Sequence, residues 1–419
     1  MYQVPRGTVD IPPQEQAYWR YIKQLADYIC QLYGYGRIDT PVFESTGLFS
    51  RSIGEGTDIV AKEMYSFKDK GGNQLTLRPE GTAPVCRAYI EHGMHNQPQP
   101  VKLYYLAPIF RYERPQAGRY RQHYQFGYEA IGDNDPVLDA EVIEMAWRFY
   151  EKLGLKKLRL LLNSIGCKKC RPDYLKSLRD YYHKHIDELC RDCRVRLEKN
   201  TLRLLDCKQL QCQPLTTLAP GSVDHLCSEC TEHFNLLKNY LSLLGLPFSI
   251  DHCLVRGLDY YTRTVFEIQP QTGGAQSTIG GGGRYDELIE ELGGKPTPAV
   301  GFATGIERII LNLKKQRIDI PPIPQPQVFI APLGEKARDE AVKLASRLRQ
   351  DGIGVLQASS SKSLKAQLRQ ANKLGAGYAV IIGEEELANG KVTLRDMATA
   401  QQETVAIEEL QGKLQRQLC

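Results

Sequence analysis

The stretch LVRGLDYYTRTVFEI, residues 254–268, places an arginine and two adjacent tyrosines at the entrance of an alternating, strand-like run. The run from residue 262 to 268 already supplies the apolar side chains that a buried strand face needs. Arg256, Tyr260 and Tyr261 are therefore surplus to the core. The pattern predicts a strand whose entrance carries a polar binding site.

Helices and strands expected around this stretch make one α+β domain. Residues 14–33 space apolar side chains three and four apart, which predicts a helix ended by Gly34, and a second helix is expected over 136–153. The polar, glycine-containing loop 115–122 separates two strand-like runs and predicts an antiparallel hairpin. Strands are expected at residues 38–45, 74–82, 101–114 and 123–132.

Two glycine-bearing segments complete this domain. Residues 277–294 indicate a glycine turn that leads into a helix, and residues 299–315 indicate a strand that turns through glycine into an amphipathic helix. Pro41 cannot donate to a strand ladder, so the segment around it is expected at a sheet edge or an interface.

A proline-rich linker separates this domain from a second one. RIDIPPIPQPQ, residues 317–327, is stiff and solvated in character. Beyond it, three short apolar strands alternate with helices, which predicts a small parallel α/β domain. The expected regions are a core at 1–159 and 234–318, a Cys-rich insertion at 160–233, a linker at 319–327 and an α/β domain at 328–419.

Composition and charge exclude few functions. The 419 residues are 42% hydrophobic and 25% charged, with a formal net charge of +5, which a solvated surface commonly carries. No apolar run is long enough to cross a bilayer and the N-terminus lacks a signal-like apolar stretch, so we expect a cytoplasmic protein. Residues 335–373 hold an excess of Lys and Arg, which fits either RNA binding or a solvated helix face.

Eight of the twelve cysteines lie between residues 167 and 230. In a reducing compartment such a concentration indicates metal binding before disulfides, and the Cys-x2-Cys spacings are those of zinc sites. Reduced buried thiols are the alternative, and the spacing leaves the pairing open. The candidate ligands are Cys167, Cys170, Cys190, Cys193, Cys207, Cys212, Cys227 and Cys230.

Several separated segments resemble the class II aminoacyl-tRNA synthetases. FRYE at 110–113 with its loop is similar to motif 2 of that class, GFATGIER at 301–308 to motif 3, and GYGRIDTPVFE at 34–44 to motif 1. Residues 254–267 and 280–294 resemble the two signatures peculiar to histidyl-tRNA synthetases, and residues 77–84 and 114–132 match the same family. The resemblance covers nearly the whole chain.

This resemblance implies an antiparallel-sheet catalytic domain, with the Cys-rich region as an insertion and the C-terminal domain reading the anticodon. It implies ATP and Mg²⁺, with L-histidine and histidine tRNA as substrates, and a homodimer with the Pro41 segment at its interface. Since many family members lack the cysteines, a zinc ion here would be structural, stapling a small insertion.

Arginines are implied for the ATP phosphates, because their planar forks bind phosphate oxygens and stay charged. By resemblance, Arg111 and Arg256 approach the α-phosphate and are catalytic, Glu113 helps to fix the adenine, and Arg119 and Arg308 reach the outer phosphates. Each arginine alone fits a surface charge, but their co-occurrence inside separate matches favours the site.

The remaining implied contacts concern histidine and tRNA. Selecting a neutral imidazole requires groups that pair with both ring nitrogens. Gln116 and Arg121 of the motif 2 loop are implied for the tRNA acceptor end, whereas His123 is expected to have no catalytic role. The residues implied for histidine are Glu80, Thr82, Arg111, Gln125, Glu129, Arg256, Tyr260 and Tyr261.

Three alternatives are kept. The four glycines at 280–283 either cradle a phosphate or close the histidine pocket, and we favour closure with Arg284 and Tyr285 in the wall. A histidine-sensing regulatory subunit of ATP phosphoribosyltransferase would share the catalytic fold without aminoacylating. Such subunits usually lack the anticodon-binding domain and these arginines, which this chain retains. A synthetase for another amino acid is opposed by RGLDYY and GGGGRYD.

Overall fold

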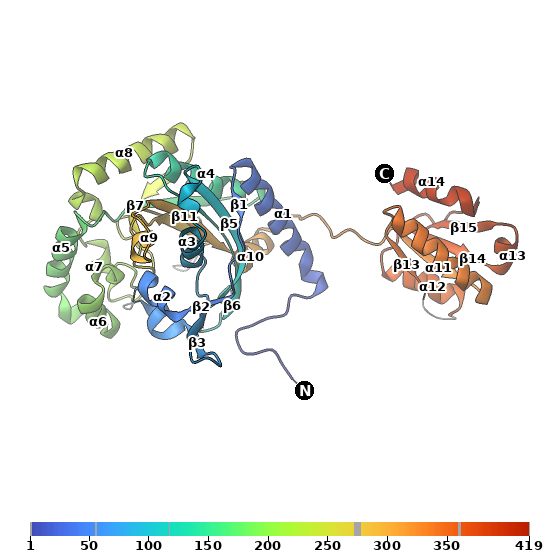
Figure 1. Cartoon of the computed structure of the whole chain (residues 1–419), viewed down its shortest axis with the longest axis horizontal. Helices are drawn as coiled ribbons and strands as arrows, with labels where there is room; N and C mark the ends of the chain where they lie inside the picture. The colour runs from blue at the N-terminus through green and yellow to red at the C-terminus, as the bar shows by residue number, and fades with distance from the viewer. Residues whose placement is uncertain (1, 55–56, 117, 272–277, 359–361, 419) are drawn as a thin grey trace. The chain divides into compact units, whose positions relative to one another are not determined.

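The computed structural model describes residues 2–54, 57–116, 118–271, 278–358 and 362–418. The chain forms two compact units, Met1–Pro321 and Pro322–Cys419. Figure 1 labels helices and strands of both units. The division falls in the predicted proline-rich segment.

An eight-stranded sheet forms the first unit, in the order β1-β5-β6-β11-β10-β9-β7-β8. The six central strands run antiparallel to their neighbours, and the short edge strands β1 and β8 pair in parallel. The antiparallel α+β prediction is therefore confirmed. The strands are β1 Gly36–Arg37, β5 Val101–Phe110, β6 Gln122–Ile131, β7 Leu158–Ser164, β8 Phe248–Ile250, β9 Thr262–Pro270, β10 Gly280–Arg284 and β11 Ala299–Gly305.

The two faces of this sheet have different covers. On one face, buried side chains of four long helices form a core cluster with Phe126, Phe266 and Phe302 of the central strands. On the other face, short helices and the insertion leave room for a cleft. The four helices are α1 Gln16–Leu32, α4 Pro136–Lys152, α8 Ser228–Leu243 and α10 Ile306–Gln316; the opposite face carries α3 Thr82–Glu91 and α9 Leu288–Glu291.

Two predicted strands and one predicted turn need correction. Only Phe43–Ser45 of the expected strand 38–45 is a strand: it is β2, which forms the edge of a three-stranded sheet with β4 (Gln74–Leu77) and β3 (Tyr65–Lys68), whereas β1 of the large sheet ends before it, at Arg37. The strand expected at 74–82 ends at Leu77, because Thr82 already begins α3. The glycines at 280–283 form strand β10 rather than a turn.

Close packing explains why that strand is made of glycine. A Cβ at Gly282 would lie 1.9 Å from the carbonyl oxygen of Gly301 on the neighbouring strand. A Cβ at Gly281 would lie 2.9 Å from Nη1 of Arg256. Any larger residue would push β11 or the arginine away, so β10 holds its neighbours unusually near.

The Cys-rich insertion is a set of short helices between β7 and α8. The predicted boundary at residue 160 falls inside β7, which is a full member of the large sheet. Helical structure begins only after Cys170. The helices are α5 Arg171–His183, α6 Arg191–Lys199 and α7 Gln213–Thr217; outside the insertion lies α2 Thr46–Ile53.

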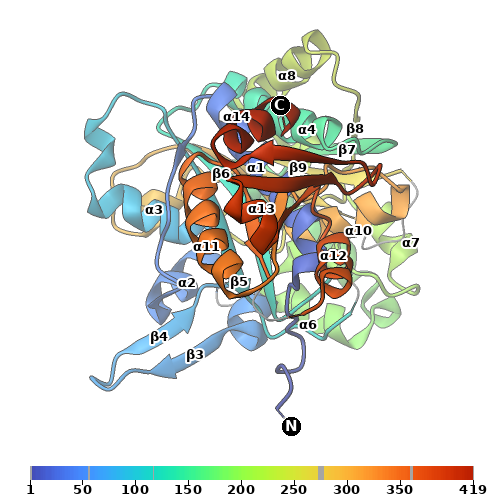
Figure 2. The ribbon, with the colours of Figure 1, turned by 90° about the vertical axis from the view of Figure 1, so that its right-hand side faces the viewer.

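The second unit is a five-stranded sheet in the order β13-β12-β14-β15-β16. The first three strands are parallel as predicted, whereas β15 and β16 add an antiparallel hairpin that the sequence analysis missed. Helices α11 and α14 cover one face and α12 the other (Figure 2). The bounds are β12 Val328–Pro332, β13 Val355–Gln357, β14 Tyr378–Ile382, β15 Lys391–Asp396, β16 Gln402–Ala406, α11 Glu335–Gln350, α12 Leu364–Lys373, α13 Glu384–Ala388 and α14 Ile407–Leu418.

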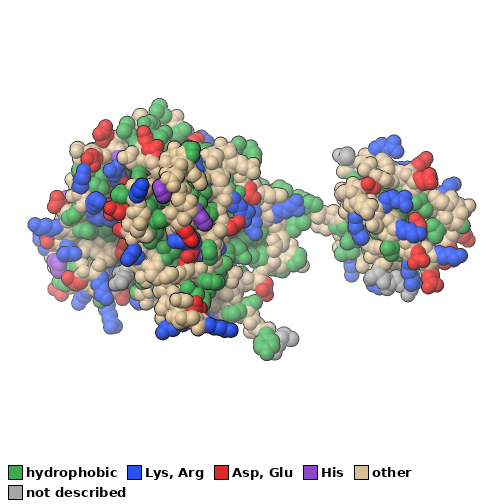
Figure 3. Space-filling model, in the orientation of Figure 1, with side chains coloured by type: hydrophobic (Ala, Val, Ile, Leu, Met, Phe, Trp, Pro, Cys, Tyr) green, Lys and Arg blue, Asp and Glu red, His purple; other side chains and the backbone are tan. Residues whose placement is uncertain are grey.

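Charges on the second unit are of both signs. On the face shown in Figure 3, its Lys and Arg side chains are interspersed with Asp and Glu side chains. The basic excess at 335–373 is thus diluted on that face. Among the described residues, the helices are all too short or too polar to span a membrane.

Candidate active site

A cleft of about 590 Å³ opens on the sheet face opposite the four long helices. Its walls come from the central strands, the start of α10 and part of the insertion. The structure brings to this one cavity most of the residues selected from the sequence: Glu80, Thr82, Arg111, Glu113, Arg119, Gln125, Glu129, Arg256, Tyr260, Tyr261 and Arg308.

One side of the cleft is lined by arginines from distant segments. Arg111, just after β5, donates from Nε to the carbonyl oxygen of Pro79 at 2.7 Å. Arg308, in the first turn of α10, donates from Nη1 to the carbonyl oxygen of Thr278 at 2.5 Å. Burial, together with the nearby positive charge of Arg119, lowers the pKa of Arg308. Arg111, Arg119, Arg256 and Arg308 outnumber the carboxylates of Glu113 and Glu267 on this side, and this excess of positive charge suits an anion.

Arg256 is anchored by Glu267, a residue that the sequence analysis did not select. Nη1 of Arg256 donates to Oε1 of Glu267, and Oε2 of Glu267 accepts from Oγ1 of Thr278 at 2.6 Å. Burial opposes the charge of Arg256, but the Glu267 carboxylate outweighs it and raises the pKa of the guanidinium. Glu267 and Gln269 alternate with Phe266 and Ile268 on β9, which assigns them to one strand face but does not distinguish a cleft from solvent.

The other side of the cleft is a closed network of side-chain hydrogen bonds. Thr82 donates from Oγ1 to Oε1 of Glu129 at 2.7 Å, and the phenol of Tyr285 donates to Oε2 at 2.5 Å. The Glu80 carboxylate accepts from the backbone N–H groups of Thr82 and Ala83, both at 2.7 Å. Burial raises the pKa of Glu129 to about 8.

Two buried oxygens on this side face no donor. Oε1 of Gln125 and the phenol oxygen of Tyr105 make no hydrogen bond within the described residues. Buried polar atoms are normally paired, so these two oxygens indicate a place for a ligand with polar groups of its own. The rings of Tyr260 and Tyr261, 4.8 Å apart, close the pocket beside them.

Glycines set the depth of this pocket. A Cβ at Gly301 would lie 1.7 Å from Oε2 of Glu129. At Gly81 and Gly127 it would lie 2.3 Å and 2.4 Å from the ring of Tyr105. The carboxylate and the ring therefore occupy positions that only glycine neighbours permit.

The residues at and beside the glycine strand, together with His123, differ in how they meet the cleft. Tyr285 lies in the wall as expected, but Arg284 points away from the cleft and is buried against Asp139. His123 lines the cleft, and burial lowers its pKa to about 3, so it is neutral near neutral pH. The pocket-closing interpretation of the glycines fits their contacts with Arg256 and with Tyr261, whose ring a Cβ at Gly283 would approach to 3.0 Å.

The two motif 2 loop residues lie beside the cleft. In the part of the chain that the structure describes, the cleft lining includes neither Gln116 nor Arg121. Gln116 forms a β-bridge with Arg119. The guanidinium of Arg121 lies 3.7 Å from the ring centre of Tyr112, a cation–π contact.

The eight selected cysteines separate into two groups of four. In each group all sulfur atoms lie within 4.8 Å of one another. Sulfur pairs in the first group are 3.9 Å apart, as is the pair Cys190 and Cys207 in the second. The pairing that spacing left open is Cys167, Cys170, Cys227 and Cys230 in one group, and Cys190, Cys193, Cys207 and Cys212 in the other.

Comparisons with known proteins agree with this geometry. Residues 7–309 match the family model "Histidyl-tRNA synthetase", and residues 327–417 match "Anticodon binding domain". A histidine–tRNA ligase of Dehalococcoides mccartyi is 63% identical over 418 residues, covering 100% of both chains. One from Desulforamulus reducens is 52% identical over 97% of each chain.

Solved structures give the same result. The apo histidyl-tRNA synthetase of S. aureus has a TM-score of 0.84 and 41% identity, covering 99% of this chain and 100% of that chain. An ATP phosphoribosyltransferase regulatory subunit/histidyl-tRNA synthetase from Bacillus halodurans has a TM-score of 0.63 and 22% identity, covering 91% and 98%. At that identity the second likeness concerns the fold alone.

Proposed function

The chain belongs to the histidyl-tRNA synthetase family, and we propose that the two sides of its cleft divide the work between ATP and histidine. The enzyme is a class II aminoacyl-tRNA synthetase that joins L-histidine to its tRNA with ATP, through a histidyl-adenylate. The observation that carries the assignment of residues is an arginine cluster next to a closed hydrogen-bonding pocket within one cavity.

In the first step, a carboxylate oxygen of histidine attacks the α-phosphorus of ATP. A P–O bond forms to the carboxylate and the bond to pyrophosphate breaks, so negative charge must be stabilised on both sides of that phosphorus. Arg111 and Arg256 are proposed to supply this charge, with Arg119 and Arg308 on the outer phosphates. The buried Nε of Arg256 has no hydrogen-bond partner in the described structure, which suits a donor waiting for substrate.

The adenine of ATP belongs, in this proposal, beside Glu113. Its carboxylate lies 3.4 Å from Nη1 of Arg119, on the arginine side. Mg²⁺, a typical companion of ATP in synthetases, would neutralise charge on the β- and γ-phosphates. Oxygen ligands suit that ion, and the carboxylates of Glu113 and Glu267 line this side of the cleft.

Histidine is proposed to occupy the closed side. A neutral imidazole has one donor and one acceptor, and it can pair with Glu129 or Tyr261 at one nitrogen and with Gln125 or Tyr260 at the other. Glu80 and Thr82 would lie near the ammonium end. An apolar side chain of similar size would leave these buried groups unpaired, which is a strong basis for rejection.

The second step moves the histidyl group to the terminal adenosine of the tRNA. Gln116 and Arg121 are proposed to meet the acceptor end, and the unit from Val328 onward to bind the anticodon, whose unstacked bases suit edge contacts and stacking. Deleting residues 328–419 should leave histidine activation close to wild type and lower tRNA charging by about a hundredfold or more. Equal loss of both activities would contradict this division.

Further parts of the proposal concern assembly and location. We infer a homodimer with the Pro41 segment at its interface, where Val42 and Phe43, the first residue of the edge strand β2, are exposed. The regions 1–159 and 234–318, 160–233, 319–327 and 328–419 remain the proposed functional division, with β7 assigned to the core. The enzyme is expected in the cytoplasm with its tRNA, and zinc is expected in the insertion as a structural ion.

Histidine-dependent ATP–pyrophosphate exchange by the full-length protein tests the central assignment. Exchange should occur with histidine and not with the other proteinogenic amino acids. Binding of histidine without exchange would instead favour the regulatory-subunit alternative, and exchange with a different amino acid would overturn the specificity. The complete anticodon-binding domain and the four arginines oppose that alternative.

A further inference from the structure

We propose that each cysteine group binds one Zn²⁺ and that the two ions hold the segment 256–263, which carries Arg256, Tyr260 and Tyr261, in the shape that receives histidine. The inference rests on the proposed function of the cleft. It assigns two metal sites and gives them a positioning role, instead of a purely local structural one.

The geometry of each group suits a tetrahedral ion. A Zn–S bond of about 2.3 Å places sulfur atoms about 3.8 Å apart, and the closest pairs lie at 3.9 Å. A disulfide would require about 2.05 Å. Backbone N–H groups also point at the sulfurs: Cys167 N lies 3.3 Å from Cys170 Sγ, and Cys190 N lies 3.3 Å from Cys212 Sγ. Such donors stabilise thiolates.

The first group is bonded directly to the tyrosine segment. Arg171, next to Cys170, donates from Nη2 to the backbone carbonyl of Tyr261 at 2.5 Å and to that of Gly166 at 3.3 Å. The Gly166 carbonyl also accepts from Arg263 N at 2.9 Å. Because Gly166 precedes Cys167, the metal-bearing loop and the segment entering β9 form one hydrogen-bonded unit.

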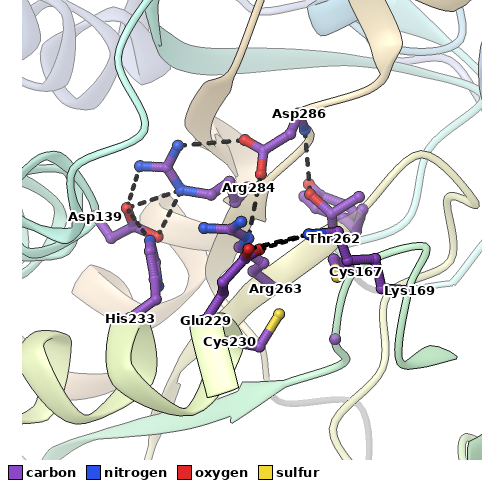
Figure 4. A network of polar contacts seen from close by, with 12 residues as sticks. Asp139, Cys167, Lys169, Glu229, Cys230, His233, Thr262, Arg263, Arg284 and Asp286 are labelled. Atoms are coloured by element: carbon purple, nitrogen blue, oxygen red, sulfur yellow. Dashed lines mark hydrogen bonds and ion pairs between the residues drawn. The ribbon is translucent and has the colours of Figure 1, made fainter. Parts of the chain in front are cut away.

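A second connection runs through the buried ion pair behind the pocket (Figure 4). His233 lies one turn after Cys230 on α8, and its Nε2 is 3.6 Å from Oδ2 of Asp139. Asp139 accepts from Nε of Arg284 at 3.0 Å, and Arg284 precedes the pocket tyrosine Tyr285. Cys227 and Cys230 fix the start of α8, so the position of this helix influences the position of Arg284 at the end of β10.

The second group is connected to the same segment by residues that lie between its cysteines in the sequence. Cys190 and Cys207 themselves line the cleft. Between them, Asn200 donates from Nδ2 to Oδ1 of Asp259 at 2.8 Å. Nη1 of Arg203 would lie 3.0 Å from a Cβ at Gly257. The segment 256–263 is thus contacted by residues next to both cysteine groups.

The helices of the second cysteine group, α6 and α7, could not hold its contacts by themselves. α6 has nine residues and α7 has five, and both are too short to be stable in isolation. Crosslinking four chain positions through one ion removes that weakness. Thiolate groups of this geometry favour zinc or an iron–sulfur centre, and a single closed four-sulfur set suits zinc.

Metal content of the intact protein is the first test. Elemental analysis after metal-replete growth should find about two zinc ions per chain, with about one in Cys227→Ser and about one in Cys212→Ser, since each variant removes a ligand from one group. Less than one zinc per chain in the wild type, or iron in its place, would overturn the metal assignment. This readout does not depend on activity.

The positioning role is tested by Arg171→Ala, with Lys169→Ala as the matched control. Lys169 lies on the same loop and pairs with Glu229 on the surface, at 3.0 Å. Arg171→Ala should keep about two zinc ions and raise the KM for histidine about tenfold or more, with the KM for ATP changed much less. Lys169→Ala should change neither the KM for histidine nor the KM for ATP.

Two results would refute that role. An unchanged histidine KM in Arg171→Ala, with zinc retained, would show that the contact to Tyr261 is not needed. An equal rise in both KM values would show a general structural effect. Absence of histidine-dependent exchange in the wild type would instead overturn the proposed function, and the zinc measurement would stand apart from that failure.

Discussion

The two sides of the cleft are built on different principles. On the arginine side, each guanidinium is fixed by one or two contacts with the main chain or with a carboxylate, as Arg111 is by Pro79 and Arg256 by Glu267. On the histidine side, side chains bind one another in a closed network centred on Glu129, and glycines set its depth. The arginine side supplies positive charge, and the histidine side supplies hydrogen-bonding groups in fixed positions.

The difference follows from what each ligand requires. A triphosphate is recognised through charge, and long arginine side chains can deliver it from segments far apart in the sequence. An imidazole is recognised through the placement of one donor and one acceptor, which a flexible side chain cannot provide. The arginine side should therefore control the rate of activation, and the histidine side should control histidine affinity.

Arg256→Ala gives the largest expected effect and the sharpest test of this contrast. Loss of a charge wanted in the transition state should lower kcat for exchange by about a thousandfold, while the dissociation constant for histidine changes by less than about tenfold. Pre-steady-state exchange and equilibrium binding measure the two quantities.

The control for this variant is Arg148→Ala, on the surface of α4, where Arg148 pairs with Glu151 at 2.8 Å. It should behave as wild type. If Arg256→Ala weakened histidine binding as much as it slowed exchange, charge and shape would not be separable at this position.

Tyr285→Phe probes the other side with a smaller expected effect. Removing the phenol leaves Oε2 of Glu129 without its donor and should raise the KM for histidine about tenfold, with little change in the KM for ATP. Tyr150→Phe is the matched control, because Tyr150 is also fully buried but belongs to the opposite face of the sheet. If Tyr285→Phe raised the KM for ATP and left the KM for histidine unchanged, the assignment of the two sides would be reversed.

The sequence selected residues on both sides of the cleft, but it missed one partner on the arginine side. Arg111 and Arg308 stand where a strand ends or a helix begins, positions that periodicity makes visible. Glu267 was missed because a single carboxylate in an alternating strand resembles a solvent-facing residue until its partner Arg256 is placed. Contacts between segments far apart in the sequence decide that question, and no local pattern records them.

The glycine strand and the cysteine groups show the same limit. Four successive glycines predicted a turn, since glycine is poor in strands, but the close approach of Gly301 and Arg256 requires them in β10. Zinc-like spacing was visible in the cysteines, whereas the pairing of Cys167 with Cys227 depends on how the insertion folds back on itself. The C-terminal hairpin β15–β16 was missed because its polar, mixed pattern lacks the apolar runs of β12 and β14.

A further test, read in the free energy of unfolding, concerns the proton on Glu129. Burial raises its pKa in the folded protein to about 8, above the ordinary carboxyl value of 4.5 that applies when the chain is unfolded. Between these values the folded state retains a proton that the unfolded state has lost, so raising the pH lowers the free energy of unfolding, by up to about 1.4 kcal/mol per pH unit. Above about pH 8 this contribution becomes constant.

Glu129→Gln removes that titration while keeping an oxygen that can accept a hydrogen bond. Thermal unfolding without ligand, followed from about pH 5.5 to pH 8.5, should therefore show the wild type losing stability relative to the variant as the pH rises, then levelling off. Other titrating groups, including Glu307, are common to both proteins and cancel in the difference. A difference that did not vary with pH would mean that Glu129 is already ionised in the folded state, and the closed side of the cleft would then be a charged site like the arginine side.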